Sequence, residues 1–160
     1  MGKIVDSDKA IQIAQRLHIE NKSIVLVGGC FDILHIGHIT FLEEAKKQGD
    51  VLVVFLESDE TIKQLKGPHR PLNTQNDRAI ILSSLSMVDY VIKLPQIKDN
   101  TYYDNLVIQI KPAIIATTAG DTTRVHKERQ AKIMNAKVVD VTSPVSNQST
   151  SRLVDILKEL

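Results

Sequence analysis

The stretch of this chain best suited to chemistry is His35-Ile36-Gly37-His38, which follows an apolar run at residues 24–27 and a glycine-containing turn at residues 28–32. The pattern predicts a buried strand that ends in glycines and leads into a helix. Two histidines three residues apart lie on one face of that helix. The free N–H groups of a helix's first turn point the same way and favour an anion, and Gly37 leaves room for a phosphate beside the backbone. Together these features predict a phosphate-handling site.

A histidine pair at this spacing is also compatible with two metal ligands. A zinc ion takes four ligands, commonly from Cys and His. The chain has 5 histidines and 1 cysteine in 160 residues, and no second histidine pair stands at ligand spacing. The composition therefore favours phosphate chemistry over a metal centre.

Short apolar runs alternate with longer amphipathic ones along the chain. Continuous Val, Ile and Leu is typical of strands buried on both faces of a parallel sheet. Such runs occupy residues 24–27, 51–56, 90–92, 113–116 and 138–141. One helix opens at the histidine pair and ends near Gly49, and a short helix follows the second strand. Further helical patterns occupy residues 9–17, 74–84, 102–110, 124–135 and 151–160.

This alternation predicts an α/β fold, a Rossmann-like, doubly wound domain with a five-stranded parallel sheet and an extra N-terminal helix. We expect residues 1–160 to form a single domain, with residues 1–22 as a helical extension and residues 23–160 as the core. In such folds ligands bind beyond the carboxyl ends of the strands, where the strand order switches. The histidine pair follows the first core strand, so we expect it at that place.

Composition limits the partners that this chain can have. The formal net charge is +1, which gives no argument for nucleic acid or for an anionic membrane surface. Cys30 is the only cysteine, so no intramolecular disulfide is possible and a reducing cytoplasm fits best. The chain shows no signal-peptide pattern and no run near the ~20 apolar residues that span a bilayer. We therefore expect a cytoplasmic protein that binds neither nucleic acid nor membrane.

Polar groups also follow other predicted strands. Lys66 and Arg70 lie in a loop marked by glycine and prolines, where they suit a polyphosphate or are simply solvated cations. Arg78 falls one turn into the next helix, where exposure is the ordinary expectation. Residues 119–121 form a plain turn or a nucleotide contact, and residues 149–151 are helix caps or phosphate ligands. Each signal is weak alone, but their repeated position after strands strengthens the prediction.

The segment from Gly29 to His38 resembles the signature of the cytidylyltransferase-like nucleotidyltransferases, with its HxGH motif. Leu65-Lys66-Gly67, Arg70-Pro71-Leu72-Asn73 and Arg78 resemble the bacterial ADP-heptose synthase branch (heptose 1-phosphate adenylyltransferase). Ser149-Thr150-Ser151 is similar to the C-terminal Ser/Thr motif of that family, with serine last where threonine is more usual. The resemblance covers nearly the whole chain.

The resemblance implies transfer of a nucleotidyl group, with ATP favoured, to a phosphorylated acceptor such as a sugar 1-phosphate, with release of pyrophosphate. It implies that His35 and His38 contact the triphosphate, with His38 stabilising charge at the α-phosphate. Lys66 and Arg70 would hold the acceptor phosphate or the pyrophosphate. Mg²⁺ is expected with the NTP, held largely by phosphate oxygens and water. Family members commonly form homodimers.

The expected site has two groups of residues. The catalytic residues are His35, His38 and Lys66. The nucleotide-binding residues are Gly29, Cys30, Phe31, Asp32, Gly37, Arg70, Arg78, Gly120, Asp121, Ser149, Thr150 and Ser151, with Arg78 and the Ser149 and Thr150 hydroxyls on the β- and γ-phosphates. No protein metal ligands are expected.

Three positions depart from the usual branch pattern, and all fall where a substrate would be discriminated. Gly28 and Glu57 each stand where asparagine is usual, and Thr117-Thr118 stands in place of Val-Lys. Losing a cation and gaining a carboxylate should change the charge of the pocket, which weighs against heptose 1-phosphate as the acceptor. The alternatives are glycerol 3-phosphate with CTP, FMN with ATP, or a nucleotide-binding module without catalysis.

Overall fold

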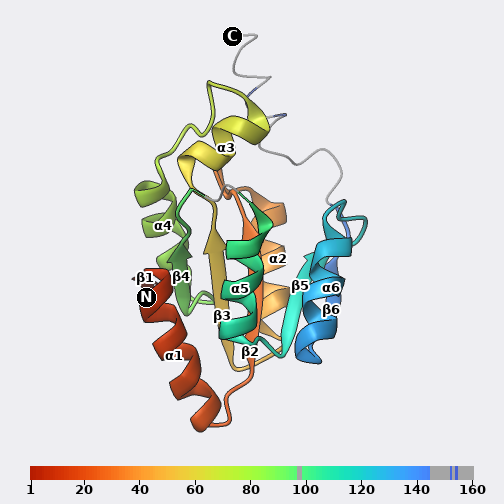
Figure 1. Cartoon of the computed structure of the whole chain (residues 1–160). Helices are drawn as coiled ribbons and strands as arrows, with labels where there is room; N and C mark the ends of the chain where they lie inside the picture. Colours follow the sequence, from red (N-terminus) through yellow and green to blue (C-terminus); the bar gives the residue numbers. More distant parts are fainter. Residues whose placement is uncertain (97–98, 145–151, 153, 155–160) are drawn as a thin grey trace.

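Six parallel strands form one sheet, in the order β1-β4-β3-β2-β5-β6 (Figure 1). The computed structural model describes residues 1–96, 99–144, 152 and 154. The strands are β1 (Lys3–Val5), β2 (Ile24–Gly29), β3 (Val51–Leu56), β4 (Tyr90–Lys93), β5 (Ile114–Thr118) and β6 (Lys137–Thr142). The helices are α1 (Ser7–Ile19), α2 (Ile36–Lys46), α3 (Asp59–Lys66), α4 (Gln75–Ser83), α5 (Asn100–Ile110) and α6 (Arg124–Met134).

The strand order switches at β2. The chain passes from β2 to β3 on one side, whereas β5, much later in the sequence, pairs with β2 on the other. The chain adds β3 and β4 on one side of β2 and then crosses back to add β5 and β6 on the other side, so an opening forms beyond the carboxyl end of β2. α3 lies above this end of the sheet in Figure 1.

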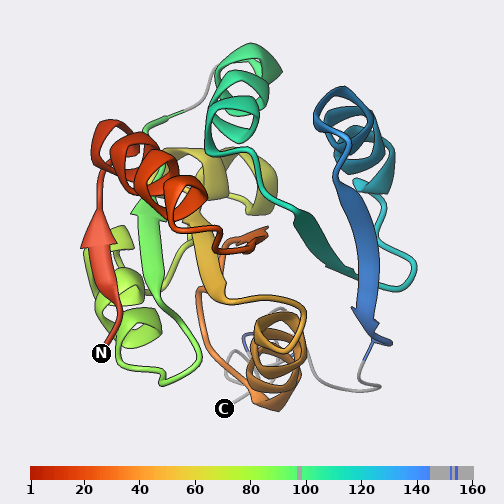
Figure 2. The same ribbon diagram turned by 90° about the horizontal axis from the view of Figure 1, so that it is seen from below.

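Helices cover both faces of the sheet, which explains why its strands carry continuous apolar runs. Alternate residues of β2 point to opposite sides: Ile24 and Leu26 pack with α1, α5 and α6, while Val25 and Val27 pack with α2 and α4. Figure 2 shows this division, with α1, α5 and α6 on one side of the strands and α2 and α4 on the other. The sheet and its two helix layers therefore fix the position of the loops at the carboxyl edge.

The predicted α/β fold with a parallel sheet is confirmed, with one strand more than the five expected. The additional strand is β1, which pairs only with β4 at the edge of the sheet. It has 3 residues, and its Ile4 is partly exposed, so no apolar run marks it. The N-terminal segment thus contributes a strand as well as the expected helix α1. Most of the helix predicted at residues 151–160 lies outside the described residues.

The part of the chain that the structure describes contains no helix long and apolar enough to cross a bilayer.

Candidate active site

The histidine pair opens α2 directly beyond the end of β2. His35 is the N-cap of α2 and its Nδ1 accepts a hydrogen bond of 3.2 Å from the Gly37 N–H. A ring that accepts through Nδ1 carries its proton on Nε2 when it is neutral. The rings of His35 and His38 lie 3.9 Å apart between centroids, and the Phe31 ring lies 5.3 Å from that of His38. The glycine turn therefore presents two adjacent imidazoles, with ring planes tilted by 31°, at the switch point of the sheet.

A cavity of about 540 Å³, called here the first cavity, lies against these rings. It is lined by residues 28–31 of the glycine turn, by His35, Gly37, His38 and Phe41, by residues 117–123, and by Lys127 and residues 142–144. It thus extends from the N-terminus of α2 to the carboxyl ends of β5 and β6. The N-terminal N–H groups of a helix and their dipole favour an anion at such a place.

Both imidazoles are held in the neutral form at neutral pH. Burial, together with the nearby charges of His35 and Lys66, lowers the pKa of His38 to about 4. Among the residues that the structure describes, no group hydrogen-bonds to its Nδ1, while the Ile33 backbone favours the charged form of the ring. Burial also lowers the pKa of His35. A bound polyanion would reverse this balance, because negative charge favours protonated imidazole.

Asp32 holds the loop that carries Arg70 against the glycine turn. Its carboxylate accepts hydrogen bonds from Arg70 Nε at 2.7 Å, from the Leu72 N–H at 2.8 Å and from the Asn73 N–H at 3.0 Å. Burial opposes ionisation, but the Asn73, Leu72 and Arg70 donors outweigh it and lower the pKa of Asp32. Both side chains of the ion pair are almost fully buried, so Asp32 anchors the loop and does not line the first cavity. One guanidinium nitrogen of Arg70, NH2, is buried without a partner in the described structure.

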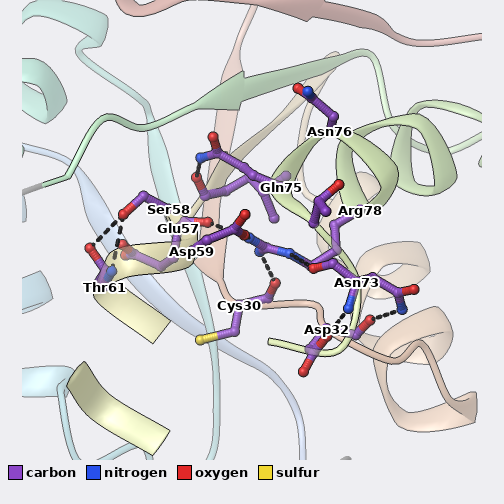
Figure 3. Close-up of polar contacts among 12 residues, drawn as sticks. Cys30, Asp32, Glu57, Ser58, Asp59, Thr61, Asn73, Gln75, Asn76 and Arg78 are labelled. Atoms are coloured by element: carbon purple, nitrogen blue, oxygen red, sulfur yellow. Dashed lines mark hydrogen bonds and ion pairs between the residues drawn. The ribbon is translucent and has the colours of Figure 1, made fainter. Parts of the chain in front are cut away.

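Arg78 lies in the interior beneath the carboxyl ends of β2 and β3. Figure 3 shows its guanidinium among Cys30, Glu57, Asp59 and Asn73. It donates to the carbonyl oxygens of Cys30, Glu57 and Asn73, at 2.5, 2.9 and 3.1 Å respectively, and pairs with Asp59 Oδ1 at 2.7 Å. The side chain is 0% exposed. Arg78 therefore links several segments of the chain in the interior. It was expected to bind phosphate, but it does not line the first cavity.

Asp121 and Lys127 form a polar cluster at the end of β5. Asp121 Oδ2 accepts from Thr117 Oγ1 at 2.6 Å and pairs with Lys127 Nζ, which also donates to Thr117 at 3.0 Å. Although burial opposes it, the Lys127 and Thr117 donors hold the pKa of Asp121 far below its usual range. Gly120 has φ of 79°, a left-handed conformation that favours glycine.

Lys127 is the residue of this region that sequence reasoning missed. It brings a cation into the first cavity from α6, close to the Thr117-Thr118 pair that lacks the usual lysine. The available signal was its position one turn into the helix that follows β5. Such a position at the carboxyl edge of a parallel sheet faces the ligand region.

The structure brings eight of the predicted residues together around the first cavity: Gly29, Cys30, Phe31, His35, Gly37, His38, Gly120 and Asp121. Lys66 is exposed at the end of α3, yet its charge lowers the pKa of His38. Burial raises the pKa of the Cys30 thiol, so this side chain is a neutral part of the wall. Ser149, Thr150 and Ser151 lie outside the described residues.

Comparison with known proteins agrees with this geometry. A doubly wound parallel sheet with an HxGH-bearing helix at its switch point defines a Rossmann-like nucleotidyltransferase domain. The family model described as Cytidylyltransferase-like matches residues 26–156, and the chain belongs to this family.

Two relatives carry the description "Bifunctional protein HldE". The one from Campylobacter fetus subsp. fetus (strain 82-40) is 38% identical over 156 residues, which cover 98% of this chain and 31% of the relative. The one from Aliarcobacter butzleri (strain RM4018) is 48% identical over 104 residues, or 65% of this chain and 21% of the relative. The chain thus spans about a third or less of the length of these curated relatives. The predicted resemblance is confirmed at the level of the family and of these relatives.

Two solved structures share the fold. A lipopolysaccharide core biosynthesis protein from Thermoplasma volcanium GSS1 superposes with a TM-score of 0.62 at 28% identity, covering 79% of this chain and 99% of that one. A pantoate-beta-alanine ligase from Francisella tularensis, complexed with beta-gamma ATP and beta-alanine, gives a TM-score of 0.64 at 19% identity and covers 99% of this chain and 77% of that one. The second likeness concerns the fold alone.

Proposed function

We propose that this protein transfers a nucleotidyl group from an NTP to a phosphorylated acceptor and releases pyrophosphate. The observation that carries the proposal is the pair of imidazoles, 3.9 Å apart between centroids, at the N-terminus of α2, facing a cavity of about 540 Å³. We favour ATP and a sugar 1-phosphate, and the HldE relatives and the ADP-heptose synthase resemblance support that choice.

In the proposed reaction a phosphate oxygen of the acceptor attacks the α-phosphorus of the NTP. A new P–O bond forms there, the bond from the α-phosphorus to the bridging oxygen breaks, and its electrons leave with pyrophosphate. No protein nucleophile is required, so the protein contributes positioning and charge stabilisation. His35 and His38 donate hydrogen bonds to the triphosphate, and His38 stabilises the charge that develops at the α-phosphate.

The cations around the turn complete the proposal. Lys66 and Arg70 hold the acceptor phosphate or the pyrophosphate, and the Nη2 atom of Arg70, buried in this structure, has no protein partner among the described residues. Ser149 and Thr150 remain the predicted ligands of the outer phosphates. Arg78 has no such role here, because its nitrogens are engaged by the protein.

Mg²⁺ enters the proposal as part of the Mg·NTP substrate. The described residues contain no group of three or more His, Cys, Asp or Glu that could hold a metal ion. The carboxylates of Asp32 and Asp121, both predicted site residues, already accept from protein donors. Homodimerisation, expected from the family resemblance, and a reducing cytoplasmic location, supported by the single cysteine, complete the proposal.

The test is pyrophosphate release with Mg²⁺, crossing ATP, CTP, GTP and UTP with sugar 1-phosphates, glycerol 3-phosphate and FMN. Release with one pair of substrates would support the proposal and name both. His38→Ala should lower kcat by about 10²–10³-fold while weakening NTP binding less. His18→Ala is the matched control, because this exposed histidine on α1 bonds the Ile110 carbonyl, away from the first cavity. NTP binding without release across the panel, unchanged by His38→Ala, would favour a binding module.

A further inference from the structure

A second cavity of about 420 Å³ lies on the other side of the β2 terminus from the histidine pair. The first cavity contacts α2, whereas the second is lined by residues of α3, α5 and α6 and by Glu57 at the end of β3. Gly28, Gly29, Cys30, Thr123 and Lys127 line both. The two cavities therefore meet over the glycines, and a molecule in the second can reach one in the first.

Two of the three departures from the branch pattern belong to the second cavity. Glu57 lines it, and Gly28 forms its boundary. A Cβ at position 28 would lie 2.7 Å from the Tyr103 hydroxyl, with no other atom nearer than 3.9 Å. The Tyr103 hydroxyl thus occupies the space that a side chain at position 28 would need. The shape of this cavity is therefore set jointly by Gly28, Glu57 and Tyr103.

Glu57 and Tyr103 present unused hydrogen-bonding atoms. Among the described residues, the Glu57 carboxylate makes no hydrogen bond or ion pair, and neither does the Tyr103 hydroxyl. Burial raises the pKa of both groups, and the Glu57 charge adds to the rise at Tyr103. The phenol therefore stays protonated and can donate, while the carboxylate accepts. A partly buried group of this kind is costly unless a ligand pairs with it.

The surrounding charges favour hydroxyl groups over an ammonium group as the partner of Glu57. The Arg78 guanidinium already lies close enough to stabilise the Glu57 charge. Asp99 accepts from the Thr101 N–H as the N-cap of α5, Asp104 is paired with Arg129, and Lys127 is paired with Asp121. The other charged groups of the lining are therefore already engaged by the protein and do not demand a cation. A hydroxyl group both donates and accepts, which matches one free acceptor beside one free donor.

A large apolar group would leave the two unused side chains of this cavity without partners. Thr61, Thr123 and Gln130 of the lining already bond to Ser58, Asp121 and Asp104 respectively. A flat apolar ring system would bury the Glu57 carboxylate and the Tyr103 hydroxyl, whereas a polyhydroxylated group would give both a partner.

We propose that the second cavity binds the non-phosphate part of the acceptor, that this part is polyhydroxylated, and that Glu57 and Tyr103 are its specificity-determining residues. This proposal rests on the proposed nucleotidyl transfer, because that reaction requires the phosphate of the acceptor to extend over Gly28 and Gly29 toward the histidine pair. Glu57 accepts from hydroxyl groups of the acceptor, and Tyr103 donates to one of them.

The test compares sugar phosphates and glycerol 3-phosphate with phosphocholine and with inorganic phosphate. In ¹⁵N-labelled protein containing Mg²⁺ and a non-hydrolysable ATP analogue, hydroxylated phosphates should shift amide signals of residues 57–61, 103–104 and 126–130. In the pyrophosphate assay, Glu57→Gln and Tyr103→Phe should each raise the KM of the hydroxylated acceptor by about fivefold or more, with the KM of the NTP unchanged.

Tyr102→Phe and Glu60→Gln are the matched controls. They make the same chemical changes at exposed neighbours outside both cavities, and both should leave the acceptor KM unchanged. A preference for phosphocholine would overturn the acceptor assignment, even if pyrophosphate is released. So would hydroxylated phosphates that do not shift the amide signals of the residues around the second cavity. Binding at this cavity without any pyrophosphate release would support it while refuting the proposed transfer, so the two failures are distinguishable.

Discussion

Arg78→Met is expected to destabilise the protein strongly, because this arginine joins the ends of two strands to a helix and a loop. Its guanidinium is fully buried and bonds three backbone carbonyls and the Asp59 carboxylate. Methionine retains the apolar volume of the stem but leaves those oxygens without their donor. Hydrogen bonds from a charged group contribute about 1.5–3 kcal/mol each, but bonds that share one group are not additive. Asp59 is 28% exposed and regains some water.

Breaking a buried pair from one side costs about 3–5 kcal/mol, and we expect the free energy of unfolding to fall by that amount. The measurement is urea unfolding followed by far-ultraviolet circular dichroism. Arg124→Met is the control. Its side chain pairs with Glu128 and Asp140 at the surface, where solvent screens the ion pairs, so its loss should cost far less than the loss of Arg78.

A cost for Arg78→Met within about 1 kcal/mol of the control would refute this reasoning. Arg78→Lys provides a folded variant for binding, because it keeps the charge but not the geometry that reaches three carbonyls. Its affinity for the Mg·ATP analogue should stay close to that of the wild type. A large loss of affinity in the folded variant would instead place Arg78 among the phosphate ligands, as the sequence suggested.

Three further outcomes test the geometry of the site. Gly28→Ala should lower the free energy of unfolding by about 1–2 kcal/mol, because the added Cβ contacts the Tyr103 hydroxyl. The same substitution should have no such effect in a Tyr103→Phe background, and equal effects in both backgrounds would contradict the contact. Because the pKa of His38 is about 4 when folded and ordinarily 6.5, the unfolded chain binds a proton first as pH falls, and stability should decrease from pH 6.5 toward pH 4. His38→Gln should remove about 2 kcal/mol of that pH dependence, allowing for partial exposure. The measurement is urea unfolding of both proteins at each pH, and the same dependence of the unfolding free energy on pH in both would contradict the role of His38 burial. Asp32→Asn should lower the free energy of unfolding by about 3 kcal/mol, because the buried Arg70 guanidinium loses its counter-charge. Amide hydrogen exchange should show faster opening of the loop that carries Arg70, and exchange at the wild-type rate would argue that Asp32 does not anchor this loop.

The central part of the fold could be predicted from local patterns. The apolar run of β2, the glycine turn and the histidine pair of α2 lie within a single stretch of the sequence, so their relation is set by strand and helix geometry. Thr74 caps α4 at the start of the helical pattern predicted for residues 74–84, donating from its side chain to Asp77 and accepting from the Asp77 N–H. Such features depend on neighbours a few residues away.

Residues whose surroundings come from distant segments could not be predicted in the same way. Arg78 is buried because the ends of β2 and β3 turn their carbonyls toward it, and nothing in its local sequence records that arrangement. Tyr103 and Lys127 reach the site from α5 and α6, far along the chain from the glycine turn. Their roles depend on how the helices pack on the sheet. The short strand β1 likewise exists only through its pairing with β4.

The glycines at the end of β2 separate two sets of residues that can diversify independently. α2 and its histidines lie on one face of the sheet, while α5 lies on the other and lines only the second cavity. Substitutions on α5 therefore need not repack the helix that bears the histidine pair. A scaffold divided in this way can exchange one ligand during evolution while it retains the other, and protein engineering can use the same boundary.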